Sequence, residues 1–151
     1  LAFEVARRFE EAGRPIAALF VSAVAAPGRV GYDDIPDTDE GLLAAVSTLT
    51  GADPEFMKNP EFAAAILPTL RGLKAIANYT CPPEVTLSCP IHAFYGDDDE
   101  IATEEKVLPW AERTTGGFTV REFSGHHFYL TDHLDELVPD VEEKLWARCR
   151  A

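Results

Sequence analysis

The sequence has few cysteines, few basic residues and no long apolar run. Its 151 residues include three cysteines, at positions 81, 89 and 149, and no C-x-x-C motif. An odd number of cysteines at irregular spacing predicts free thiols, as expected in a reducing cytosol, so we expect a cytoplasmic protein. Lys and Arg number 13 against 26 Asp and Glu, a net charge of −13, which argues against binding to nucleic-acid phosphates. Because no stretch of about 18 apolar residues occurs, no membrane span is predicted.

The sequence also lacks a nucleophile motif and a metal-binding motif. None of its four serines stands in a Gly-x-Ser-x-Gly turn. These serines are Ser22, Ser47, Ser88 and Ser124. No H-x-x-x-H or H-E-x-x-H motif occurs, although the acids near position 98 together with His126, His127 and His133 leave metal binding open as an alternative. We therefore expect neither a metal nor a cofactor.

Three segments have the pattern of β-strands. Residues 16–24 and 90–95 are continuously apolar, as buried strands of a parallel sheet are, and residues 118–123 alternate as an outer strand does. With helical segments between them, they indicate an α/β fold of parallel strands and flanking helices. Three strands make a poor sheet by themselves, which favours a partial domain over a complete one.

Apolar residues at helical spacing mark three further segments. Residues 1–12 predict a helix that Gly13 is suited to cap at its C-terminus. Residues 103–114 predict a second, with Thr103 as its N-terminal cap, and residues 132–148 predict the terminal helix. The expected buried stripe of that terminal helix is Leu134, Leu137, Val138, Val141 and Leu145.

A block of helical pattern from residue 39 to 79 separates the first two strands. It is longer than a crossover between parallel strands requires. Pro68 lies inside it and predicts a break or a kink. The larger apolar side chains that we expect to face a cavity or the sheet are Phe56, Phe62, Leu70 and Leu73.

A histidine on a glycine-containing loop is the first candidate for chemistry. Ser124-Gly125-His126-His127 follows the strand 118–123 and precedes the terminal helix. A loop histidine is more often a solvated surface residue, but this strand–glycine–histidine–helix context favours a general base. We assign that role to His127, with His126 as the competitor, because neighbouring side chains on a loop point in different directions.

An acidic cluster, Asp97-Asp98-Asp99-Glu100, follows the strand 90–95. Such a cluster is more often a solvated turn. A catalytic histidine, however, needs one carboxylate that fixes its tautomer and stabilises its protonated form. Because Gly96 permits a tight exit from the strand and the fourth position swings back across the strand ends, Asp99, rather than Asp97 or Asp98, is predicted to hydrogen-bond His127.

Further motifs run along the whole chain. They are Ala2-Phe3-Glu4, Ser22…Ala26-Pro27-Gly28, Leu67-Pro68-Thr69-Leu70-Arg71 and Cys89-Pro90-Ile91. Together with Gly-x-x-Asp at 96–99 and Gly-x-His-Phe-Tyr-Leu at 125–130, they resemble type II thioesterases, the stand-alone α/β-hydrolases that serve polyketide and non-ribosomal peptide synthases. His126 departs from that family, which usually has Gly or Asp there. The resemblance implies the C-terminal part of an α/β-hydrolase fold, with the nucleophile elbow before Leu1.

The resemblance also implies an activity. A serine upstream of this chain would attack an acyl thioester on the phosphopantetheine arm of an acyl carrier protein, His127 would move the proton, and Asp99 would hold His127. The partners would be carrier-protein domains of a polyketide or peptide synthase, with complex lipid synthesis as a related setting. Residues 37–80 would form a helical lid, and the substrate-binding residues would include Phe128, Leu70 and Phe62.

Two other functions stay open. Esterases and lipases have a similar acid and base, and a chain without a nucleophile can also be a non-catalytic interaction module. We expect the isolated 151-residue chain to be inactive toward thioesters and poorly stable, because three strands leave an unpaired sheet edge.

Overall fold

The computed structural model describes residues 1–29, 36–50, 52–77 and 79–149, with the side chains of residues 49, 73–77, 148 and 149 excepted. The chain divides into two compact units. One comprises Leu1–Arg29 and Cys81–Ala151, and the other comprises Val30–Thr80. Among the described residues, no helix is both long and apolar enough to cross a membrane.

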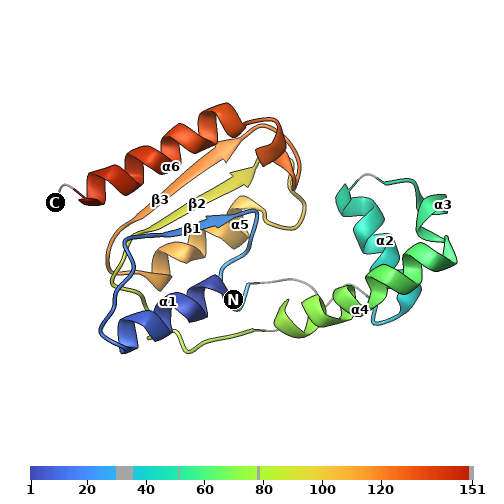
Figure 1. Cartoon of the computed structure of the whole chain (residues 1–151), viewed down its shortest axis with the longest axis horizontal. Coiled ribbons are helices and arrows are strands. Elements are labelled where there is room, and N and C mark those ends of the chain that lie inside the picture. The colour runs from blue at the N-terminus through green and yellow to red at the C-terminus, as the bar shows by residue number, and fades with distance from the viewer. Residues whose placement is uncertain (30–35, 51, 78, 150–151) are drawn as a thin grey trace. The chain divides into compact units, whose positions relative to one another are not determined.

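The first unit is built on a parallel sheet with the strand order β1-β2-β3 (Figure 1). The strands are β1 (Leu19–Ser22), β2 (Ile91–Gly96) and β3 (Phe118–Phe123). Leu19 pairs with Ile91, and Ile91 pairs with Phe118, so the carboxyl ends of the strands share one edge. All six residues of the central β2 are buried, which accounts for its continuous apolar character. The three predicted strands are confirmed, although β1 is shorter than the predicted 16–24.

One face of the sheet is covered by α6 (Leu134–Cys149) (Figure 1). Leu137 and Val141 of this helix pack against the buried cluster of Phe94, Phe123 and Tyr129. The rest of the predicted stripe is wrong, since Leu134, Val138 and Leu145 are exposed. The less exposed positions are instead His133, Leu137, Asp140, Val141 and Lys144. These residues are three or four positions apart and so share one face. On that face the hydrogen-bonded pair of Asp140 and Lys144 occupies positions where apolar residues were expected.

The other face carries α1 (Ala2–Glu11), α5 (Glu104–Val107) and the 3₁₀ helix η1 (Leu108–Arg113) (Figure 1). The ring centroids of Phe3 and Trp110 lie 5.8 Å apart in the core of this face. Gly13 has φ +71° directly after α1, as its predicted capping role requires.

The single helix predicted over residues 103–114 is instead α5 followed by η1. Pro109 explains the change of helix type, because it has no N–H to donate to an α-helical bond. Thr103 is the N-terminal cap residue of α5 as predicted, but its hydroxyl makes no capping hydrogen bond. Its carbonyl oxygen accepts the N–H of Lys106 instead, at 2.9 Å.

The second unit consists of α2 (Asp39–Thr50), α3 (Pro54–Met57) and α4 (Pro60–Ala77). The helical pattern predicted from 39 to 79 is therefore confirmed. Of the break or kink predicted at Pro68, the break is absent, since α4 continues through this residue. Asp53 and Asn59 cap α3 and α4 by accepting backbone N–H groups of their first turns. An ion pair between Arg71 and Asp39 joins α4 to α2.

Candidate active site

The loops that follow β2 and β3 lie side by side at the carboxyl edge of the sheet. We call residues 97–100 the acid loop and residues 124–128 the base loop. Three successive acids contact three successive residues of the base loop. The pairs are Asp97 Oδ1 with Gly125 N at 2.8 Å, Asp98 Oδ2 with His126 Nδ1 at 2.9 Å, and Asp99 Oδ2 with His127 Nδ1 at 2.9 Å. The parallel pairing of β2 and β3 thus continues past the strand ends through side chains.

Gly96 makes this close approach of the two loops sterically feasible. A β-carbon added there would lie 2.2 Å from the carbonyl oxygen of Gly125 and 2.6 Å from that of His126. Both obstacles are backbone atoms, so no side-chain rotation can relieve them. Gly96 was predicted to matter because it permits a tight exit from the strand. In the structure, it matters because only a residue without a β-carbon leaves room for the backbone of the base loop.

Asp99 is the buried member of the acidic cluster. Its side chain is fully buried, and its Oδ1 accepts the backbone N–H groups of Ile101 at 2.8 Å and Ala102 at 3.0 Å. Its Oδ2 faces His127 Nδ1 at 2.9 Å, so the predicted pairing of Asp99 with His127 is confirmed. Three donors hold this carboxylate in one orientation, which favours the tautomer of His127 that carries its proton on Nδ1.

His127 keeps its second ring nitrogen free. Its side chain is 23% exposed, and within the described part of the chain Nε2 has no hydrogen-bond partner. A neutral imidazole with Nδ1–H donated to a carboxylate presents a lone pair at Nε2. That lone pair is able to accept a proton from a nucleophile and to return it to a leaving group.

His126 and Asp98 form an outer pair with a different environment. Their side chains are 79% and 71% exposed, compared with 23% for His127 and none for Asp99. Because water screens exposed charges, the outer pair contributes little to the energetics of the site. The adjacent histidines thus point to different surroundings, as predicted.

Of the three predicted substrate-binding residues, Phe128 belongs to the unit with the sheet, and Phe62 and Leu70 belong to the helical unit. The Phe128 side chain is half exposed, and its ring meets the His127 ring edge-on with 5.1 Å between centroids. Phe62 and Leu70 are half-buried residues of α4, in the helical unit, where the Phe62 ring packs 4.7 Å from Phe56. Phe128 therefore stands beside the candidate base, and a substrate role for Phe62 and Leu70 stays a prediction.

A hydrogen bond between Ser22 and Tyr129 was not predicted. The Ser22 hydroxyl at the end of β1 lies 2.6 Å from the Tyr129 hydroxyl, which follows the base loop. Tyr129 is buried, and this burial raises the pKa of its phenol, so the hydroxyl stays neutral. No local pattern signals a contact between residues 107 positions apart.

Removing either hydroxyl should have unequal effects on stability. Ser22→Ala leaves the buried Tyr129 hydroxyl without its partner, at a cost of about 1–3 kcal/mol, whereas Tyr129→Phe leaves an exposed serine that bonds to water and should cost about 1 kcal/mol or less. Urea unfolding of the complete protein measures both values. A larger loss in Tyr129→Phe than in Ser22→Ala would contradict the inferred importance of this bond.

Parallel strands flanked by helices, with a buried carboxylate after one strand and a histidine after the next, define a member of the α/β-hydrolase fold. The chain belongs to the thioesterase domain family, whose sequence profile matches residues 1–145. Both the predicted fold and the predicted resemblance to type II thioesterases are confirmed.

Named relatives agree with this family. The chain is 52% identical over 150 residues to thioesterase TesA of Mycobacterium leprae, covering 99% of this chain and 58% of that protein. It is 35% identical over 148 residues to thioesterase PikA5 of Streptomyces venezuelae, covering 96% of this chain and 53% of that protein. The solved type II thioesterase BorB from the borrelidin biosynthetic cluster is 41% identical with a TM-score of 0.79, covering 95% of this chain and 60% of that one. The chain thus spans less than two thirds of the length of each.

Proposed function

We propose that this chain supplies the acid and the base of a Ser-Asp-His thioesterase that releases acyl groups from carrier-protein phosphopantetheine. The setting is polyketide, non-ribosomal peptide or complex lipid synthesis. The observation that carries the proposal is the 2.9 Å contact of His127 with the buried Asp99, in a chain of the thioesterase family. The borrelidin cluster from which BorB comes supports such a setting.

The nucleophile in this proposal belongs to a segment before Leu1. The relatives are longer than this chain, which covers 58% of TesA and 53% of PikA5, so they have residues that it does not match. None of Ser22, Ser47, Ser88 and Ser124 stands in a nucleophile turn. On this proposal, the 151 residues alone do not turn over thioesters.

The chemistry assigned to His127 follows from its two nitrogens. Nε2 takes the proton of the serine hydroxyl as the oxygen attacks the thioester carbonyl. The imidazolium that forms keeps Nδ1–H on Asp99 Oδ2, and the carboxylate stabilises its charge. Nε2 then gives the proton to the leaving thiolate, and the same cycle with water releases the acid and restores the serine.

The helical unit and Phe128 are assigned to the substrate in this proposal. The helical unit would be a lid of about residues 37–80, with Phe62 and Leu70 lining the acyl group. Phe128, half exposed beside His127, would contact the acyl chain next to the thioester. Apolar side chains at these positions suit a hydrocarbon substrate.

An esterase or lipase is the second candidate, because the same acid and base serve oxygen esters. The test uses the complete protein, meaning the natural chain that contains these 151 residues. Its kcat/KM should be at least about tenfold higher for an acyl group on a carrier protein than for the same acyl group as a p-nitrophenyl ester, because carrier contacts add binding energy in the transition state. A preference for the ester, or no turnover of either substrate, would refute the thioesterase proposal.

A further inference from the structure

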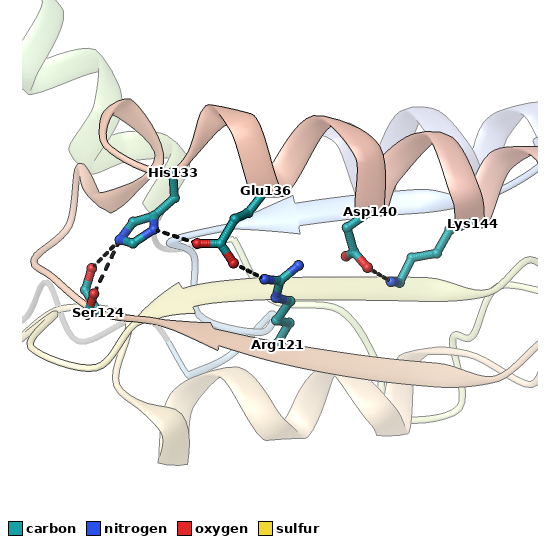
Figure 2. A network of polar contacts seen from close by, with 6 residues as sticks. All are labelled: Arg121, Ser124, His133, Glu136, Asp140 and Lys144. Atoms are coloured by element: carbon teal, nitrogen blue, oxygen red, sulfur yellow. Dashed lines mark hydrogen bonds and ion pairs between the residues drawn. The ribbon is translucent and has the colours of Figure 1, made fainter.

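His133 lies between the base loop and the first turn of α6 (Figure 2). Its Nε2 is 2.9 Å from the carbonyl oxygen of Ser124, and its Nδ1 is 3.3 Å from Glu136 Oε1. The imidazole also lies against the Phe123 ring, with 5.3 Å between centroids. One side chain thus connects the start of the base loop to the helix that follows it.

Glu136 is held from the opposite side by β3. Its Oε2 accepts a hydrogen bond from the Arg121 guanidinium at 2.5 Å (Figure 2). Arg121 in turn lies over the Phe123 ring, with its Cζ 4.4 Å from the ring centroid. His133 is therefore backed by a carboxylate that the neighbouring strand keeps in place.

The Ser124 carbonyl occupies a sensitive point of the base loop. The next residue, Gly125, has φ +122°, a conformation open to glycine and strained for other residues. Since glycine offers no side chain to fix this turn, bonds from outside must hold it. The Asp97 carboxylate holds Gly125 from the acid loop, and His133, directly before α6, holds Ser124.

We propose that His133 is a positioning residue for His127, because it holds the Ser124 carbonyl and with it the base loop, most firmly as the imidazolium. The inference rests on the proposed function, in which His127 is the base. His133 itself has no contact with the reacting atoms in this proposal and acts through the backbone of residues 124–127.

The preference for the imidazolium follows from the backbone carbonyl and the carboxylate that the ring faces, besides the Ser124 hydroxyl oxygen 3.3 Å from Nε2. Neutral imidazole has one N–H and is able to donate to only one of the Ser124 carbonyl and the Glu136 carboxylate, whereas the imidazolium donates to both. These two hydrogen bonds, that to Ser124 first, raise the pKa of His133, and the negative charges of Glu136 and Asp132 add to the effect. The facing cation is Arg121 on β3, which is paired with Glu136.

A raised pKa fixes the direction of the pH effect. The imidazolium makes both hydrogen bonds, to Ser124 and to Glu136. This added stabilisation of the base loop is fully present below the ordinary histidine pKa of about 6.5, and it is lost as the pH rises through the raised pKa of folded His133. Activity should therefore fall as the pH rises through the raised pKa of His133. The falling limb of the kcat profile reports on His133.

The test measures kcat and KM against pH in the complete protein. His133→Leu should lower kcat about tenfold below neutral pH, with KM changed less than about twofold, as expected for an interaction that matters in the transition state. His133→Gln keeps one neutral donor, so it should recover most of kcat and lose the falling limb. A tenfold change in KM with kcat unchanged, or a falling limb that persists in His133→Gln, would overturn the proposal.

A second pair of variants keeps the proposal testable if His133→Leu does not fold. Glu136→Gln, at an exposed position, removes the charge behind the ring and should move the falling limb and the His133 pKa, followed by NMR titration of the ring, to lower pH. Asp135→Asn, at another exposed acid of the same helical turn, is the matched control and should move neither. Equal shifts in both variants would contradict the proposal.

The two proposals fail in distinguishable ways. If His127→Ala keeps full activity, the proposed function is wrong. If His127→Ala is inactive while the kcat profiles of His133→Gln and Glu136→Gln match that of the unmodified protein, only the positioning role of His133 is wrong.

Discussion

Replacing His127 by alanine in the complete protein should lower kcat by roughly 10⁴-fold or more, because members of a catalytic triad act as a unit. On the proposed function the variant lacks the base, and the buried Asp99 carboxylate loses the partner 2.9 Å away. Steady-state turnover of an acyl carrier thioester at saturating substrate measures the effect. Circular dichroism confirms that the variant is folded.

The control for this prediction is the adjacent histidine. His126→Ala removes only an exposed pair with Asp98, worth about 0–1 kcal/mol, so its kcat should change by less than about threefold. Asp99→Asn should also cost roughly 10⁴-fold, since an amide is unable to fix the same tautomer. Combining Asp99→Asn with His127→Ala should add little to the single loss. Comparable losses for His126→Ala and His127→Ala would contradict the assignment of the base.

Gly96→Ala should be among the most destabilising single substitutions in this protein, by about 3 kcal/mol or more. The new methyl group would overlap the carbonyl oxygens of Gly125 and His126, so the acid and base loops must separate. That separation would break the bond from the Asp98 N–H to the Gly125 carbonyl, now 3.1 Å, and displace His127 from Asp99. Urea unfolding and thioester turnover of the complete protein should therefore both show a large loss.

Gly72→Ala is the matched control for the chemical change. Gly72 lies in α4, and an added β-carbon would meet nothing within 4 Å. Alanine is a better helix former than glycine, so this variant should gain about 0.5–1 kcal/mol in stability. Turnover should stay within about twofold, because the substitution fills empty space. If Gly96→Ala were as stable as the unmodified protein, the close approach of the two loops would be wrong.

Local pattern was sufficient to predict the elements of this chain. Continuous apolar segments identified β1 and β2, since a strand covered on both faces has little room for polar residues. The Gly-x-x-Asp spacing identified Asp99, and the loop between a strand and the last helix identified His127. Parallel strands bring their carboxyl ends to one edge, so two loops far apart in sequence were expected to meet there.

The faces of the helices were less predictable. The apolar stripe of α6 was wrong at Leu134, Val138 and Leu145, because the helix turns a row that includes Asp140 and Lys144 toward the sheet. Of the two outcomes predicted at Pro68, a break or a kink, the break was wrong, since α4 continues through it. Helical periodicity shows which residues share a face, but the neighbouring elements decide which face is covered.

The sequence by itself predicted the fold class, the three strands and the pairing of Asp99 with His127. Only the tertiary structure decided which residues of the base loop Asp97 and Asp98 contact, because burial and register separate these side chains from that of Asp99. The contacts of Ser22 with Tyr129 and of His133 with Ser124 likewise depend on how elements pack in space. Hydrogen bonds between distant side chains leave no periodic signal in a sequence, since each depends on a single pair of positions.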